Sequence, residues 1–139
     1  YQGYCSDMTR TIAIGRVSEE QRKIYDVVKK AQETALAGIR PEMTGAQIDK
    51  LARDVIKKAG YGEYFGHALG HSVGLEIHES PNFSPREETV ICPGMVITVE
   101  PGIYVEGVGG VRIEDVVVIT EDGCENITHS AKEWIEVEE

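Results

Sequence analysis

Three of the four histidines in the 139-residue chain fall within one short segment, FGHALGHSVGLEIHES, at residues 65–80. Glycine recurs at every fourth position of this segment, and each glycine inside a helix costs about 1 kcal/mol relative to alanine. The segment is therefore expected to be extended or irregular. An extended chain would place His67 and His71 on one face and His78 on the other. The glycines would let the backbone approach a substrate or another strand closely.

Three carboxylates stand at the ends or junctions of apolar, strand-like runs. Asp7 opens the run DMTRTIAIG, Glu100 directly follows MVITV, and Glu114 lies inside VRIEDVVVIT. A buried carboxylate costs several kcal/mol unless it is paired or binds a metal. Each of these residues also has an ordinary explanation. Glu114 could pair with Arg112, two residues back on the same face, and Asp7 could close a turn or pair with Arg10.

Taken together, one or two imidazoles and three carboxylates form a hard, oxygen-rich set of donors. Such a set suits Mn²⁺, Co²⁺, Fe²⁺ or Zn²⁺ better than a thiolate site would. Several carboxylates around one point indicate a two-metal site, which would generate a hydroxide nucleophile and polarise a carbonyl. A lone histidine in a loop is more often a satisfied polar residue than a ligand, so residue types alone leave this interpretation open. The zinc-peptidase pattern H-E-x-x-H is absent, because SPN follows His78-Glu79.

Two amphipathic helices are predicted ahead of the histidine-rich segment. The patterns S-x-x-Q at 18–21 and T-x-x-Q at 44–47 are capping boxes, which start helices. The first helix should run to about Ile39, because the proline at 41 disfavours helix in the residue before it, and the second should stop at a left-handed Gly60. The residues expected to face the core are Ile24, Val27, Val28, Ala31, Ala35 and Ile39 in the first helix and Ile48, Leu51, Ala52, Val55, Ile56 and Ala59 in the second.

The rest of the chain is expected to consist of strands, turns and loops. We predict a strand over residues 7–15, a loop over 79–89, and two strands separated by Pro-Gly within 94–105. A turn follows at 107–110, and then one strand over 111–120 whose far end is buried on both faces. The order of these elements predicts an α+β fold, with the helices against one side of a mostly antiparallel sheet.

Composition excludes some classes of function. The 14 basic residues against 24 acidic ones give a net charge of −10, which argues against nucleic acid as a partner. No apolar run approaches the length of a membrane span, so no membrane partner is expected. The three cysteines are widely spaced and odd in number, and they form neither a disulfide framework nor a CxxC pair. We expect them to be free thiols in a reducing cytosol, which makes a cytoplasmic location the prediction.

Four sequence blocks, in order along nearly the whole chain, resemble the signatures of a known family. They are YQGYCSDMTRT, FGHALGHSVGLEIHESP, PGMVITVEPGIY and GGVRIEDVVVIT. They resemble the creatinase/aminopeptidase metallopeptidases, and more narrowly the Xaa-Pro branch that includes aminopeptidase P and prolidase. The EPGIY block favours this branch over methionine aminopeptidases. The resemblance implies part of the duplicated α+β fold known as pita-bread, with helices packed on a curved, mostly antiparallel sheet.

By this resemblance, Asp7 and Glu114 are ligands that bridge two metal ions, and His71 is the histidine ligand. Glu100 is a ligand and also the proton shuttle. The resemblance implies two divalent ions in the intact protein, Mn²⁺, Co²⁺ or Zn²⁺. The family's first ligand aspartate lies upstream of the SDMTRT block, and this chain begins after that position. We therefore expect residues 1–139 to be the C-terminal portion of a metallopeptidase catalytic domain whose N-terminal part is missing. We expect it to bind one metal ion and to have little activity alone.

The resemblance also assigns residues to the substrate. His67 and His78 match two non-ligand histidines that hold the substrate and the tetrahedral intermediate, so these two and Glu100 are the predicted catalytic residues. Arg112 resembles a residue that orients a carboxylate ligand, and Tyr104 is expected to line the site. The expected reaction is hydrolysis of the bond before proline in a proline-containing peptide. The sequence does not distinguish an Xaa-Pro dipeptidase from an Xaa-Pro aminopeptidase.

Two alternatives stay open at this point. The first is a non-catalytic module, because some relatives keep this fold and bind proteins or peptides without metal. Those relatives lose the ligands, whereas here every ligand position that the chain covers is filled. The second is a methionine aminopeptidase or a creatinase-type hydrolase, against which the EPGIY block counts. A homodimer is the assembly that we expect, although the sequence does not set the oligomeric state.

Overall fold

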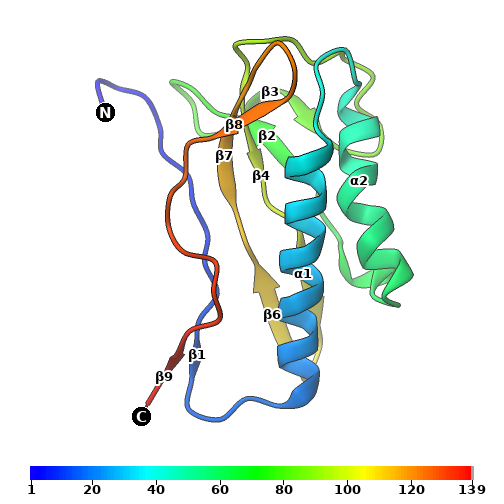
Figure 1. The fold of residues 1–139 in the computed structure, drawn as a ribbon, viewed down its shortest axis with the longest axis vertical. Helices are drawn as coiled ribbons and strands as arrows, with labels where there is room; N and C mark the ends of the chain where they lie inside the picture. Colours follow the sequence, from blue (N-terminus) through cyan, green and yellow to red (C-terminus); the bar gives the residue numbers. More distant parts are fainter. Residues whose placement is uncertain (139) are drawn as a thin grey trace.

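Both predicted helices begin at their capping boxes in the computed structural model, which describes residues 1–138 (Figure 1). Helix α1 spans Glu19–Gly38, and helix α2 spans Gly45–Lys58. In each, the N-cap hydroxyl accepts from the backbone N–H three residues on, and the glutamine there bonds back to the N-cap backbone. Gly60 has a φ of +91°, the left-handed conformation expected of a residue that stops a helix. The helix predictions are therefore confirmed.

Most strands of the chain form one antiparallel sheet with the order β3-β2-β4-β7-β8. Its strands are β2 (Gly70–Ser72), β3 (Glu79–Phe83), β4 (Val96–Val99), β7 (Asp115–Ile119) and β8 (Cys124–Asn126). A separate antiparallel hairpin consists of β5 (Gly102–Val105) and β6 (Gly109–Arg112). A short parallel pair joins β1 (Ala13–Ile14) to β9 (Glu136–Val137), and a 3-10 turn, η1, spans Gly62–Tyr64.

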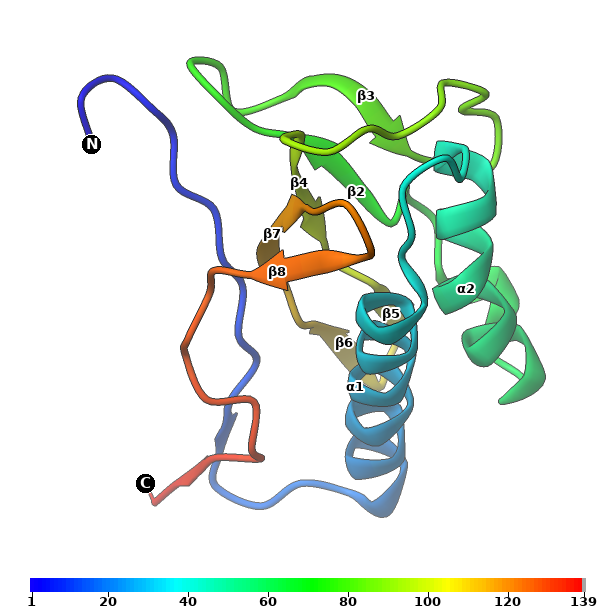
Figure 2. The ribbon, with the colours of Figure 1, turned by 45° about the horizontal axis from the view of Figure 1, so that its top comes forward.

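The two helices lie on the same side of the sheet, as Figures 1 and 2 show. Helix α1 packs against α2 and over β4, β5 and β6, while α2 contacts β3. This arrangement confirms the α+β prediction. The fully buried side chains that fill the space between helices and sheet include Tyr25, Ile24, Ile39, Ile48, Ile56, Leu69, Phe83, Ile91, Ile97, Ile103, Ile113 and Ile119. Among residues 1–138, no helix combines the length and the apolar character that crossing a membrane would require.

The N-terminal segment does not form the predicted strand. Only β1 pairs as a strand, and Thr9 makes a single isolated bridge to Glu114. Between Thr9 and β1, side-chain hydrogen bonds take the place of backbone pairing. The Thr11 hydroxyl donates to the Arg112 carbonyl at 2.9 Å and accepts from the Arg112 N–H at 3.2 Å. The segment runs beside residues 127–135 (Figures 1 and 2), held there by bonds such as that from the Ala13 N–H to the Ile135 carbonyl.

Two other predicted boundaries were wrong. Residues 79–83 are not a loop, because they pair with β2 as an edge strand, where a proline without an N–H is tolerated. The single strand predicted over 111–120 is two strands, β6 and β7. The break falls at Ile113 and Glu114, because the chain there changes its partner from β5 to β4. Glu114 bonds instead to Thr9, its N–H donating to the Thr9 carbonyl at 3.0 Å.

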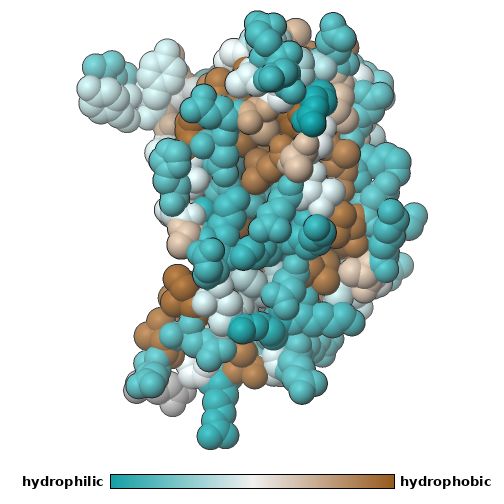
Figure 3. Space-filling model, in the orientation of Figure 1, coloured by the Kyte–Doolittle hydropathy of each residue, from teal (hydrophilic) through white to brown (hydrophobic). Residues whose placement is uncertain are grey.

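Hydrophilic residues cover much of the face that Figure 3 shows, and one of the groups of hydrophobic residues on it lies where β1 and β9 meet. In this region Ile12, Ile14, Ile135 and Val137 are 44–69% exposed.

Candidate metal centre

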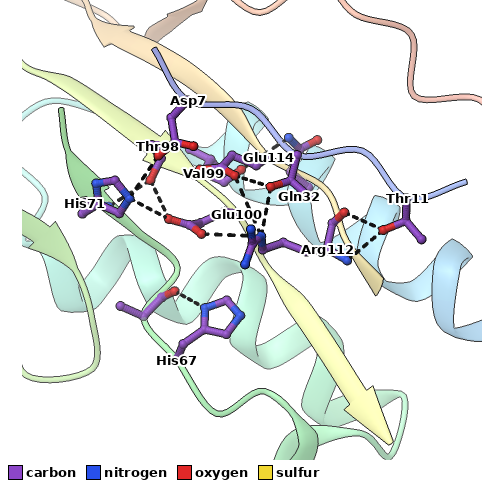
Figure 4. A network of polar contacts seen from close by, with 12 residues as sticks. Asp7, Thr11, Gln32, His67, His71, Thr98, Val99, Glu100, Arg112 and Glu114 are labelled. Atoms are coloured by element: carbon purple, nitrogen blue, oxygen red, sulfur yellow. Dashed lines mark hydrogen bonds and ion pairs between the residues drawn. The ribbon is translucent and has the colours of Figure 1, made fainter. Parts of the chain in front are cut away.

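The four predicted ligands come from separate parts of the fold and meet at one place (Figure 4). Asp7 lies on the N-terminal segment, His71 on β2, Glu100 just after β4, and Glu114 at the break between β6 and β7. His71 Nε2 lies 3.2 Å from Glu100 Oε1 and 3.6 Å from Asp7 Oδ2. Asp7, His71 and Glu114 each offer one donor atom, and these three atoms all lie within 4.8 Å of one another.

Close packing of β2 on β4 brings His71 to Glu100. A Cβ at Gly70 would lie 1.8 Å from the Thr98 carbonyl oxygen, so only glycine fits there. The buried Thr98 hydroxyl accepts from the His71 N–H at 3.0 Å and donates to Glu100 Oε1 at 2.9 Å. The Glu100 N–H donates to the Leu69 carbonyl at 2.7 Å. The prediction that glycines let this segment approach another strand is thus correct at Gly70.

Glu114 is the most buried of the predicted ligands, with 1% of its surface exposed. Its Oε2 accepts from the Thr9 hydroxyl at 2.5 Å, and the same hydroxyl accepts from Arg112 Nε at 3.0 Å. Burial raises the pKa of Glu114, and the charges of Glu100 and Asp7 raise it further, whereas the Thr9 hydrogen bond and Arg112 lower it. The balance leaves the Glu114 pKa above its usual value, so ionised Glu114 is in a costly environment unless a cation is bound.

Arg112 does not form the close pair with Glu114 that the sequence offered as an ordinary explanation. Its Nε lies 3.9 Å from Glu114 Oε2 and 4.0 Å from Glu100 Oε2, with Thr9 between it and Glu114. The alternative pair of Asp7 with Arg10 does not form either, because Arg10 bonds to Asp115 instead. The ion pairs therefore leave most of the negative charge at this place uncompensated.

The tautomer of His71 favours metal binding. Its Nδ1 faces the Ser72 carbonyl at 3.1 Å, and since a carbonyl only accepts, Nδ1 carries the proton in a neutral ring. The lone pair of Nε2 then faces the oxygens of Glu100 and Asp7, which also offer lone pairs. Facing lone pairs without a positive charge between them repel one another. A divalent cation supplies that charge, and mixed oxygen and imidazole donors suit it.

The other two histidines lie in different parts of the cleft. The ring of His78 meets that of His71 edge to face, with centroids 4.4 Å apart. The chain reverses between them, since the Gly74 N–H donates to the Glu76 carbonyl, so the expectation of opposite faces was wrong. His67 Nδ1 lies 2.8 Å from the Ala68 carbonyl, which leaves His67 Nε2 to accept from the Tyr104 hydroxyl at 3.1 Å.

All of the site residues predicted from the sequence except Tyr104 line one cleft of about 640 Å³. Its lining is Asp7, His67, Ala68, Gly70, His71, Ile77, His78, Asn82, Glu100, Arg112 and Glu114. Asn82 was missed by the sequence analysis, and its buried Oδ1 has no hydrogen-bond partner within residues 1–138. Thr9 was missed too, because nothing in its position marks it as a contact of Glu114. A larger groove of about 750 Å³ lies between α1 and α2, and none of the predicted site residues lines it.

Comparison with known proteins agrees with this geometry. Residues 1–121 match metallopeptidase family M24. The chain is 53% identical over 135 residues to an Xaa-Pro dipeptidase from Pyrococcus furiosus, a match that covers 97% of this chain and 39% of that protein. It superposes on the Xaa-Pro dipeptidase from Bacillus anthracis with a TM-score of 0.97 and 54% identity, and on the X-Pro aminopeptidase from Thermotoga maritima with a TM-score of 0.94 and 45% identity.

Each of these structural matches covers 99% of this chain, and the chain spans 39% of the length of each of the three proteins. Likeness at this level confirms the pita-bread fold that the four sequence blocks implied. Membership of a metallopeptidase family implies a divalent metal ion, for which the Asp7, His71 and Glu114 group is suited. The chain belongs to metallopeptidase family M24.

Proposed function

We propose that this chain is the C-terminal part of the catalytic domain of an exopeptidase that uses two metal ions and hydrolyses the peptide bond before proline. One observation carries the proposal: Asp7, His71, Glu100 and Glu114, from four separate elements, direct their donor atoms into the same cleft. A structural role would not require three carboxylates with so little compensating charge, because buried charges are costly unless paired or bound to metal. The names of the similar proteins supply the substrate class.

In this proposal Asp7, His71, Glu100 and Glu114 would hold the divalent ions of the complete protein. Mn²⁺, Co²⁺ and Zn²⁺ all suit these donors, and one ion is proposed for residues 1–139 alone. A metal bound there would activate a water molecule and polarise the carbonyl of the scissile bond. Glu100 would take the proton from the attacking water and deliver it to the leaving nitrogen. Its position between Thr98, His71 and Arg112 fits that task.

The remaining polar residues of the cleft would act on the substrate. His78, beside the His71 ring, would donate a hydrogen bond to the oxygen that becomes negative as the carbonyl is attacked. His67 would orient the peptide, and Tyr104 would hold the His67 ring through the hydroxyl contact at 3.1 Å. Arg112 would orient Glu114 through Thr9, since its Nε donates to the hydroxyl that bonds to the carboxylate.

The proposal is tested by comparing Xaa-Pro dipeptides with Xaa-Pro-Yaa tripeptides as substrates of the complete protein. Cleavage of dipeptides alone would make it a dipeptidase, and cleavage of the longer peptides an aminopeptidase. The change of His78 to Ala should lower kcat by about 10²–10³-fold, the usual cost of one donor to a developing oxyanion, and leave the bound metal in place. A metal-free purified protein that neither binds Mn²⁺ nor cleaves either substrate would instead support a non-catalytic module.

The number of ions in residues 1–139 is tested separately by calorimetric titration with Mn²⁺. We expect one tight site and little turnover. Two equally tight sites would contradict the proposal, as would a rate comparable to that of the complete protein. The exposed thiols of Cys5 and Cys92 agree with a reducing compartment, and we propose the cytoplasm as the location.

A further inference from the structure

Arg10 uses every N–H group of its guanidinium, although it is not a predicted ligand or substrate contact. Arginine has five such groups in a fixed planar fork. Nε donates to the Ala131 carbonyl at 2.9 Å, Nη1 to the carbonyls of Thr9 at 2.8 Å and Glu114 at 2.6 Å, and Nη2 to Asp115 Oδ1 at 2.7 Å and the Ser130 carbonyl at 2.8 Å. Its side chain is only 14% exposed.

These five bonds join three parts of the chain that are far apart in sequence. The first is the N-terminal segment, which carries Asp7. The second is the break between β6 and β7, which carries Glu114. The third is the segment at 130–131, whose two backbone carbonyls accept from Arg10. Because Nη1 bonds to the Thr9 and Glu114 carbonyls at once, it fixes the spacing between the two backbones that carry ligands.

Backbone pairing between strands contributes little to holding the N-terminal segment beside Glu114. Within residues 1–12 the only bridge to β-structure is that between Thr9 and Glu114. Without Arg10, the segment that carries Asp7 would keep that bridge, the Thr9 hydroxyl bond, the two Thr11–Arg112 bonds and the Cys5 N–H bond to the Gly74 carbonyl. Of these, only the bridge and the Thr9 hydroxyl reach Glu114 itself. Arg10 itself is anchored by Asp115, which is fully buried and also bonds to Lys132 and Asn126.

We propose that Arg10 is a positioning residue of the metal centre, which holds Asp7 and Glu114 at the separation that one cation requires. This inference rests on the proposed function. Arg10 does not touch the cleft, so it acts only through the backbones it joins. Loss of such a supporting contact typically weakens metal binding by about 10–100-fold.

Charge and geometry predict opposite effects of removing Arg10. A cation near the site repels a bound metal, so on electrostatic grounds alone Arg10→Gln would bind Mn²⁺ more tightly and Arg10→Lys would bind it as the wild type does. Positioning predicts weaker binding for both, because lysine lacks the planar fork and cannot make the five bonds together. The sign of the change therefore separates the two effects.

The chain offers a matched control in Arg53. It also pairs with a buried aspartate, Asp49, and donates to two backbone carbonyls, those of Phe65 and His67. The same change, Arg53→Lys, removes similar bonds from the carbonyls of Phe65 and His67, neither of which is a predicted metal ligand. It should lower the melting temperature as Arg10→Lys does, while Mn²⁺ affinity stays within about threefold of wild type.

The experiment is calorimetric titration of Mn²⁺ into the complete protein, with unfolding measured in EDTA for each variant. Arg10→Lys and Arg10→Gln should each bind Mn²⁺ about 10–100-fold more weakly than wild type. Binding by Arg10→Lys within about threefold of wild type would overturn the inference, as would tighter binding by Arg10→Gln. An equal loss in Arg53→Lys would show general loosening instead of positioning. A wild-type protein that binds no Mn²⁺ would overturn the proposed function as well, which distinguishes the two failures.

Discussion

Gly70→Ala should disrupt both the sheet and the metal centre, because the added methyl group has no space. Its Cβ would lie 1.8 Å from the Thr98 carbonyl oxygen, whereas real Cβ atoms essentially never come closer than 3.0 Å to another atom. Strands β2 and β4 would have to separate at the point where they hold His71 and Glu100. The neighbour to be displaced is backbone of a central strand, so no side-chain rotation can relieve the clash.

The cost follows from the bonds that cross this point. The Glu100 N–H donates to the Leu69 carbonyl, and the His71 N–H donates to the Thr98 hydroxyl. At least one of these two hydrogen bonds would break when the strands separate. A buried group left unpaired costs about 1–3 kcal/mol, and overpacking a tight site adds about 1–3 kcal/mol. We therefore expect a loss of about 2–6 kcal/mol in the free energy of unfolding, a large share of the roughly 5–15 kcal/mol that holds a typical protein folded.

Urea unfolding of the metal-free protein measures this loss, and Gly66→Ala serves as its matched control. Gly66 belongs to the same glycine-rich segment, but a Cβ there has no atom within 4 Å. Gly66→Ala should therefore change the free energy of unfolding by less than about 1 kcal/mol. Stabilisation by added Mn²⁺ should persist in Gly66→Ala and fall in Gly70→Ala. If the two variants unfold at the same urea concentration, the close contact of β2 with β4 at Gly70 does not make glycine necessary for stability.

Three further changes test the site. Burial, with the charges of Glu100 and Asp7, raises the pKa of Glu114, so in EDTA the free energy of unfolding should increase as the pH falls through that pKa. Glu114→Gln should remove this increase and bind no Mn²⁺. A variant with the same dependence of stability on pH as the wild type would refute this. Thr9→Val, which loses the hydroxyl between Glu114 and Arg112, should weaken Mn²⁺ binding by about tenfold in calorimetry, whereas Thr9→Ser should bind as wild type does; equal affinities would refute it. Tyr104→Phe should raise KM for an Xaa-Pro substrate by about tenfold without altering the metal content, because His67 loses the hydroxyl that holds its ring; an unchanged KM would count against the contact.

Local signals in the sequence were sufficient for the helices. A capping box and a stripe of apolar residues act within a few turns, so the starts at Ser18 and Thr44 and the stop at Gly60 could be predicted without the rest of the chain. The convergence of the four ligands is a different matter, because it depends on contacts between residues as far apart as Thr9 and Glu114. The positions of the carboxylates at the ends and junctions of apolar runs indicated Asp7, Glu100 and Glu114, and only the resemblance to a family distinguished His71 from the other histidines.

The failures of the strand prediction share a physical cause. Alternation of apolar and polar residues reports which side of a chain is buried, but not which strand supplies the hydrogen bonds. Residues 111–114 alternate and residues 116–119 are continuously apolar, as in one strand with a buried end, yet their partner changes from β5 to β4 at Ile113 and Glu114. Residues 7–15 also alternate, yet most of their bonds to the fold come from side chains. For this reason the sequence alone indicates Arg10 only as a possible pair for Asp7.

The breaks in the ladder lie at three of the four predicted ligands, the carboxylates, whereas His71 lies within β2. Glu100 follows the last residue of β4, Glu114 separates β6 from β7, and Asp7 lies before any pairing begins. Inside a regular ladder, the side chain direction is fixed by the pleat, and neighbouring strands would point ligands at parallel, separated positions. At a break, the backbone N–H finds one isolated partner, Leu69 for Glu100 and Thr9 for Glu114, and the side chain turns toward the common point. Single bonds of this kind hold a backbone less firmly than a ladder does, which is why a densely bonded side chain such as Arg10 has a role here that a strand interior would not need.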